Sequence, residues 1–220
     1  ASLESLLGSM TDAAFIEEPY VPEEGTLDGD CFVAGTRIAI VADGVLGHMF
    51  IEDVGVGVEV LSYNFSKGKV EPRKVVRTMS PIHSDIVEFA FSDGTFTKHT
   101  FDRPYYVVGE GWSSYAPDLT ISRYKHEDLR NTRAILVGDE CMTVDGGTVK
   151  LVEINEQASE PTQTYNFNVE GNENYFADDV LVHNKTKTRA ERIQFDTELI
   201  HEMGEFEVQG EDIDDDGGVR

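Results

Sequence analysis

The feature that most constrains this fold is a succession of short β-type runs between Cys31 and Asn184. Each run is rich in Val, Ile, Tyr, Phe and Thr, and each is closed by Gly, Asp, Asn or Pro. Helical periodicity is almost absent here. The pattern predicts an all-β domain with a sandwich or barrel-like body. We expect strands at residues 32–41, 59–63, 69–80, 86–91, 95–108, 132–137, 141–144, 149–154, 163–169 and 174–182.

Three turn sequences support hairpins within this region. Asp93-Gly94, Asp145-Gly146 and Glu170-Gly171-Asn172 supply the positive-φ residues that tight hairpins require. Most neighbouring strands should therefore be antiparallel.

Composition divides the chain into a central domain, residues 31–184, and two acidic flanks, residues 1–30 and 185–220. Residues 1–30 hold eight acidic residues and no basic one, and residues 185–220 hold eleven acidic and five basic ones. Weak helix signals follow Thr11 and recur in residues 190–203, so we expect flexible or partly helical flanks. The acidic run 211–216 lacks the ligand spacing of a calcium-binding EF-hand.

Charge and cysteine content exclude several classes of protein. The net charge of −24 opposes binding to nucleic acid or to anionic membranes, because both reward Lys and Arg. The sequence has no apolar run of about 18 residues and no basic N-terminal region. It therefore predicts neither a membrane span nor a signal peptide. Cys31 and Cys141 are too few for a secreted disulfide scaffold, so we expect cytoplasmic synthesis and leave one bridge between them open.

Cys31 is the first candidate for chemistry. Its thiolate could attack the carbonyl of the preceding residue, Asp30, and form a thioester by an N-to-S acyl shift. The alternative is a small buried cysteine within a sheet.

Asn184 is the second candidate, 153 residues further on. Its side-chain amide could attack its own carbonyl, close a succinimide and release Lys185. His183 is suited to hydrogen-bond that carbonyl or to move a proton near neutral pH. The alternative is a polar end to a strand.

Together the two ends resemble the hedgehog/intein (Hint) family, which includes inteins and bacterial intein-like domains. Residues 31–38 (CFVAGTRI) match its opening motif, and residues 165–170 and 174–184 match its closing motifs. The resemblance spans roughly residues 31 to 184. It implies a horseshoe of short antiparallel strands, a nucleophile at Cys31, a terminal asparagine at Asn184, and self-processing without a cofactor.

Two residues depart from the family pattern. Splicing needs a hydroxyl or thiol directly after the asparagine, but Lys185 has neither, so we expect cleavage rather than ligation. The usual Thr-x-x-His-Pro motif reads TFDRP at residues 100–104, with Thr100 and Asp102 in place and Arg103 instead of histidine. An arginine cannot exchange a proton at neutral pH, so the first step should be slower by about 10² to 10⁴.

Two further positions bear on the absence of the motif histidine. His99 could replace the missing histidine only if the strand bends, because four extended residues span about 13 Å. Glu173 stands where many relatives carry another histidine, which could weaken asparagine cyclisation.

Two functions remain open at this point. One is an autoprocessing domain that cleaves Asp30–Cys31, Asn184–Lys185 or both, acting on the flanks of its own precursor. The other is a silent Hint-fold module that binds other subunits of a virion or cell-surface assembly through its flanks. The chain resembles the Hint modules that are embedded in phage and bacterial structural or surface proteins.

The remaining histidines predict no metal site and no cofactor. His48, His83, His126 and His201 are scattered without metal-ligand spacing, so surface or satisfied-core roles are expected. No Gly-rich phosphate loop and no basic aromatic patch occurs.

Overall fold

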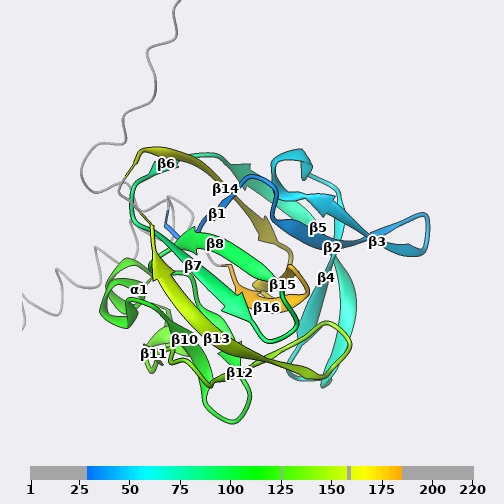
Figure 1. Ribbon diagram of the computed structural model, residues 1–220. Helices are drawn as coiled ribbons and strands as arrows, with labels where there is room; N and C mark the ends of the chain where they lie inside the picture. Colours follow the sequence, from blue (N-terminus) through cyan, green and yellow to red (C-terminus); the bar gives the residue numbers. More distant parts are fainter. Residues whose placement is uncertain (1–28, 125, 158–159, 185–220) are drawn as a thin grey trace, which may run out of the picture.

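A computed structural model describes residues 29–124, 126–157 and 160–184 (Figure 1). As predicted, this part of the chain is mostly β-structure. Its elements are β1 (Phe32–Val33), β2 (Arg37–Ala42), β3 (Val45–Phe50), η2 (Ile51–Asp53), β4 (Glu59–Asn64), β5 (Lys69–Met79), β6 (Ile82–His83), β7 (Ile86–Phe91), β8 (Phe96–Thr100), β9 (Tyr105–Val107), β10 (Gly111–Ser114), α1 (Pro117–Tyr124), η3 (Glu127–Leu129), β11 (Arg133–Ala134), β12 (Glu140–Met142), β13 (Thr148–Glu156), β14 (Thr162–Val169), β15 (Asn174–Ala177) and β16 (Val180–His183).

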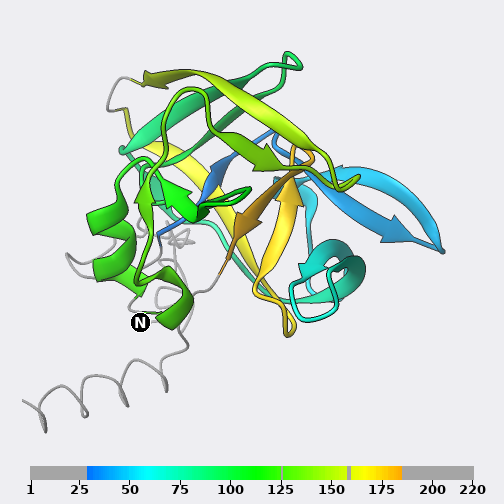
Figure 2. The ribbon, with the colours of Figure 1, turned by 90° about the horizontal axis from the view of Figure 1, so that it is seen from below.

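Hydrogen bonds join the strands into one 16-stranded sheet. Its order is β11-β10-β9-β12-β13-β7-β8-β1-β14-β5-β4-β2-β15-β16, and β16 also pairs with β9, so the path returns on itself. The strands wrap around a common interior, from which the β2–β3 hairpin projects (Figures 1 and 2). This closure brings β1, at the start of the described chain, and β16, at its end, into one body.

An aromatic core lies inside this sheet. Phe32, Phe89, Tyr105, Phe167 and Tyr175 are each at most 1% exposed. The rings of Phe167 and Tyr175 lie 4.2 Å apart between centroids. Burying such a side chain stabilises the fold by roughly 1.5–3 kcal/mol. The core therefore holds β1 firmly between β8 and β14.

Two predicted hairpins are confirmed, β7–β8 at Gly94 and β12–β13 at Gly146. The third prediction was wrong, because the turn at Gly171 joins β14 to β15, which pair with other strands. One further turn was missed. Gly94, Gly146 and Gly171 all have positive φ. Residues 174–182, predicted as one strand, form the β15–β16 hairpin around Asp178 and Asp179, whose φ angles are 46° and 65°. The turn lacks glycine, and aspartate tolerates the left-handed region better than most residues.

Other predicted strands also changed. Residues 32–41 and 95–108 each divide into two strands, and residues 132–137 contain only the short strand β11. The strands β3, β6 and β10 were not predicted, and β3 carries mostly exposed residues.

The helix α1 was not predicted from the sequence. Pro117 opens it, where a missing N–H costs nothing, and Thr120 and Tyr124 are its buried residues one turn apart. Both are polar, so the helix lacks the apolar stripe that reveals most helices. The 3-10 helix η3 follows and is anchored by Leu129, which is fully buried.

Within these ranges no helix has the length and apolar character that a bilayer crossing needs. The helix signals expected near Thr11 and in residues 190–203 lie outside the described residues, as do His201 and the acidic run 211–216.

Candidate functional site

The sheet fixes the Asp30–Cys31 peptide at the entrance to β1. The Cys31 N–H donates to Thr100 Oγ1 at 3.0 Å, and the Thr100 N–H donates to the Cys31 carbonyl at 3.0 Å. Thr100 ends β8, the antiparallel neighbour of β1. This predicted motif residue therefore holds the nitrogen that an acyl shift would release.

Asp30 precedes the cysteine in an uncommon backbone conformation. Its φ of 57° lies in the left-handed region, where a residue other than glycine carries a conformational cost. The Asp30 N–H donates to Asp102 Oδ1 at 3.2 Å, and its side chain accepts from Asn166 Nδ2 at 2.6 Å. Two neighbours thus hold the residue whose carbonyl Cys31 would attack.

Cys31 itself is a poor source of thiolate. It is 1% exposed, and its Sγ lies 3.7 Å from the Gly29 carbonyl oxygen. Burial, followed by the charge of Asp30, raises the pKa of the Cys31 thiol far above its usual range. The sulfur is therefore a thiol at neutral pH and needs a base to become a nucleophile.

Asp102 is an ionised side chain that accepts hydrogen bonds from Asp30 and from two residues of α1. It accepts from the Tyr124 hydroxyl at 2.6 Å and from Arg123 Nη1 at 3.0 Å, both on α1. Burial alone would raise the pKa of Asp102, but Arg123 and Tyr124 outweigh it and lower the pKa below the usual value. A Cβ at Gly29 would overlap Asp102 Oδ2 and the Tyr124 hydroxyl, so a larger residue there would displace this hydrogen-bonded pair.

Arg103 lies between the two ends of the domain. It is fully buried, and its Nη1 lies 3.3 Å from Asp30 Oδ2 and 2.8 Å from the His183 carbonyl oxygen. Its guanidinium stacks 4.4 Å from the centre of the Phe32 ring. Burial opposes the charge, but Asp30 raises the pKa of Arg103 above its ordinary value. Arg103, which stays charged, therefore contacts a residue at each junction, the Asp30 side chain and the His183 carbonyl. It contacts the side chain of Asp30 rather than the scissile nitrogen.

His183 and Asn184 end β16 in a buried position. The His183 N–H donates to the Pro104 carbonyl at 3.0 Å, and the Asn184 N–H donates to the Glu173 carbonyl at 2.9 Å. Asn184 Nδ2 donates to the Phe167 carbonyl, while its buried Oδ1 has no partner among the described residues. The Asn184 amide is thus oriented by its Nδ2 group, and its Oδ1 atom is unsatisfied among the described residues.

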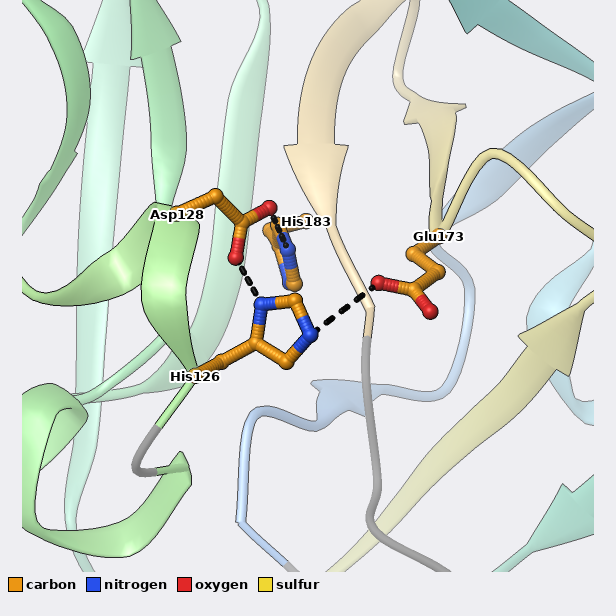
Figure 3. Close-up of side chains that lie close together, drawn as sticks. All are labelled: His126, Asp128, Glu173 and His183. Carbon is orange, nitrogen blue, oxygen red and sulfur yellow. Dashed lines mark hydrogen bonds and ion pairs between the residues drawn. The ribbon is translucent and has the colours of Figure 1, made fainter.

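Asp128, which the sequence analysis did not select, supports His183 (Figure 3). His183 Nε2 lies 3.0 Å from Asp128 Oδ2, and the ring packs edge-on against Trp112 at 5.0 Å. The buried His183 Nδ1 has no partner among the described residues. Such an arrangement fixes the orientation of the imidazole. No spacing rule would find Asp128, because it lies 55 residues from His183.

The partners of Asp128 also determine its protonation. Burial would raise the pKa of Asp128, but hydrogen bonds from His126 and His183 outweigh this effect and hold the pKa far below its usual range. Asp128 is therefore a carboxylate near neutral pH.

His99 does not take over the role of the missing histidine. Its Nδ1 bonds the Thr100 carbonyl at 2.8 Å, and its Nε2 has no partner among the described residues. Its ring packs among Phe32, Phe89 and Tyr105. Burial lowers the pKa of His99 to about 3, so it is a neutral core residue.

The two cysteines do not pair. Cys31 and Cys141 are both buried, and no disulfide joins them. The bridge that the sequence left open is therefore not formed.

Neither a protein-family model nor a curated protein matches this sequence. Solved structures do match. A bacterial intein-like domain from Clostridium thermocellum has a TM-score of 0.58 and 25% identity, covering 70% of this chain and 98% of its own. A DnaB intein from Synechocystis has a TM-score of 0.54 and 16% identity, covering 71% and 99%. The DnaB mini-intein variant M86 has a TM-score of 0.58 and 15% identity, covering 73% and 97%. This chain therefore has the Hint fold that inteins and bacterial intein-like domains share.

Proposed function

We propose that this chain is an autoprocessing domain that cleaves the Asn184–Lys185 bond in cis and does not splice. One observation carries the proposal: the Asp128–His183 pair adjoins a buried Asn184 whose amide is held by Phe167. The likeness to a bacterial intein-like domain supports autoprocessing in general.

The reaction needs only groups of this chain. Asn184 Nδ2 loses a proton and attacks the Asn184 carbonyl carbon, the bond to the Lys185 nitrogen breaks, and that nitrogen gains a proton. His183 directly precedes Asn184, and its imidazole, oriented by Asp128, supplies a hydrogen bond or a proton to the reacting groups. The products are a C-terminal succinimide and a free Lys185 amine.

The Asp30–Cys31 junction is the less competent one in this proposal. The Cys31 thiol has a raised pKa, and Thr100 Oγ1 accepts from the scissile nitrogen instead of protonating it. Arg103 cannot supply the proton either, because it stays charged. A thioester formed there would find no acceptor at Lys185, so water or an added thiol would have to resolve it.

The silent module remains the second candidate, and one observation favours it. Arg103 ties the Asp30 side chain to the His183 carbonyl, which rigidifies both junctions. In this role the flanks would stay attached and bind neighbouring subunits of a structural assembly.

Intact-mass spectrometry of the purified full chain at neutral pH separates these candidates. We expect a fragment ending at Asn184 that is lighter by one water than the hydrolysis product. Asn184→Ala should abolish the fragment, and Asn155→Ala, a matched change on β13, should not. A full chain that stays intact through prolonged incubation would favour the silent module.

A further inference from the structure

Two contacts of different kinds restrain the His183 ring. Its Nε2 lies 3.0 Å from Asp128 Oδ2. A hydrogen bond at one nitrogen sets the direction of an imidazole, but it leaves the ring plane able to rotate about that bond. The Trp112 ring lies 5.0 Å from the His183 ring between centroids, at an interplanar angle of 90°. Edge-to-face aromatic pairs prefer this geometry, so the contact restrains the ring plane that the hydrogen bond leaves free.

Trp112 reaches His183 from a strand that is not its direct neighbour. Trp112 lies on β10, which pairs with β9, and β9 in turn pairs with β16. Its partner on β9 is Tyr106, whose ring lies 5.2 Å from the indole at 78°. Trp112 is only 8% exposed. The indole is therefore a buried group that contacts both Tyr106 and His183 across β9.

Phe65 packs on the same aromatic group from the surface. It directly follows β4, and it is 45% exposed. Its ring lies 4.9 Å from the Tyr63 ring, 4.9 Å from the Tyr106 ring and 6.0 Å from the Trp112 ring. An isolated exposed phenylalanine needs no explanation, but one that packs on three rings restricts their motion.

We propose that Trp112 and Phe65 are positioning residues for cleavage at Asn184–Lys185. Trp112 fixes the plane of the His183 ring, and Phe65 holds Trp112 in place from the surface. The effect on cleavage rests on the proposed function, whereas the orientation of the His183 ring does not.

The alternative is a secondary hydrophobic cluster that contributes only stability. Trp112 does pack in such a cluster, together with the buried Phe176 and Leu181. The two interpretations differ in the effect of a surface substitution on the cleavage rate. An aromatic pair shifts a conformational equilibrium by about 2- to 10-fold, and misplacing a reacting group by about 1 Å can cost about 10²-fold in rate.

The cleavage test uses the full chain and follows intact mass over time. Phe65→Ser should slow cleavage by about 2- to 10-fold, and Phe65→Tyr, which keeps a ring, should recover most of the rate. Trp112→Leu should slow cleavage by about 10- to 100-fold. Phe96→Ser is the matched control, because Phe96 on β8 is 60% exposed, and its rate should be unchanged.

Two outcomes of this test would overturn the proposal. One is a Phe65→Ser chain that cleaves as fast as the unaltered chain, and the other is a Phe65→Tyr chain as slow as Phe65→Ser. Urea unfolding of each variant shows that the folded protein is compared. Phe65 is a surface residue, so its variants decide the question even where Trp112→Leu does not fold.

A second measurement does not depend on cleavage. In an Asn184→Ala background, which cannot cyclise, nuclear Overhauser contacts between the Trp112 indole and the His183 ring protons report the packing. Trp112 is the single tryptophan of the chain, so its indole N–H gives one signal. The contacts should be present in this background and with Phe96→Ser, and they should weaken with Phe65→Ser.

Absence of these contacts from the background, or contacts that Phe65→Ser leaves unchanged, would overturn the positioning of His183. A chain that shows the contacts but does not cleave would refute the proposed function and would leave the orientation of His183 by Trp112 and Phe65 supported.

Discussion

Arg103 Nη1 donates a 2.8 Å hydrogen bond to the main-chain carbonyl of His183, 80 residues away in the sequence. The same nitrogen lies 3.3 Å from the carboxylate of Asp30. One buried cation thus connects the residue before the first junction with the residue before the terminal asparagine. Arg103, at the position where the Hint motif has histidine, therefore links the two ends of the domain.

Arg103→Met should destabilise the fold by about 3–5 kcal/mol, because it leaves the Asp30 carboxylate buried without its cation. Adding Asp30→Asn should recover much of that loss, since the amide keeps an acceptor for Asn166. Urea unfolding of the two variants measures the difference. Equal stabilities would show that the ion pair contributes little.

Arg103→His, combined with Asp30→Asn, should accelerate release of residues 1–30 by dithiothreitol. The imidazole restores a proton donor near the scissile amide, an effect worth about 10² or more in rate. Intact mass over time gives the rate, with Asp30→Asn alone as the control. If the double variant is no faster than this control, the defect lies elsewhere than at Arg103.

Asp128→Asn should slow cleavage at Asn184–Lys185 by about 10² to 10⁴, because His183 loses the carboxylate that orients its imidazole. Asp118→Asn, at an exposed position of α1, should leave the rate unchanged. Fragment formation followed by mass spectrometry compares them. An unaffected rate in Asp128→Asn would remove Asp128 from the mechanism.

Acidification should destabilise the domain through His99. Its folded pKa of about 3 is depressed below the unfolded value of 6.5, so the unfolded chain binds the extra proton as pH falls through this window. Between pH 6.5 and pH 5 the free energy of unfolding should fall by about 1.6 kcal/mol from this group alone. His99→Phe should remove that part of the pH dependence in urea titrations, and an unchanged slope would contradict the assignment.

Cys31 should resist alkylation by iodoacetamide in the folded protein. Burial raises the pKa of its thiol, so almost no thiolate exists at neutral pH. Tested in Cys141→Ser, the modification should be slow in buffer and fast in urea, as read by intact mass. Rapid labelling of the folded chain would show that the thiol is exposed or activated.

The amino-acid sequence determined the β-rich class, most hairpin turns and the two candidate junctions, because strand propensity, positive-φ turns and terminal motifs are local properties. The sequence also identified Arg103 and Lys185 as departures from the Hint-family pattern, because their positions in the motifs are enough to show this. The domain limits of 31–184 and the role of the flanks remain predictions.

Tertiary structure alone decided which residues meet. Asp128 reaches His183 across 55 positions and Arg103 reaches the His183 carbonyl across 80, through a sheet that closes between β9 and β16. The helix α1 escaped detection because its buried face is polar and binds Asp102. Contacts of this kind depend on how distant strands pair, and no local pattern in the chain encodes that pairing.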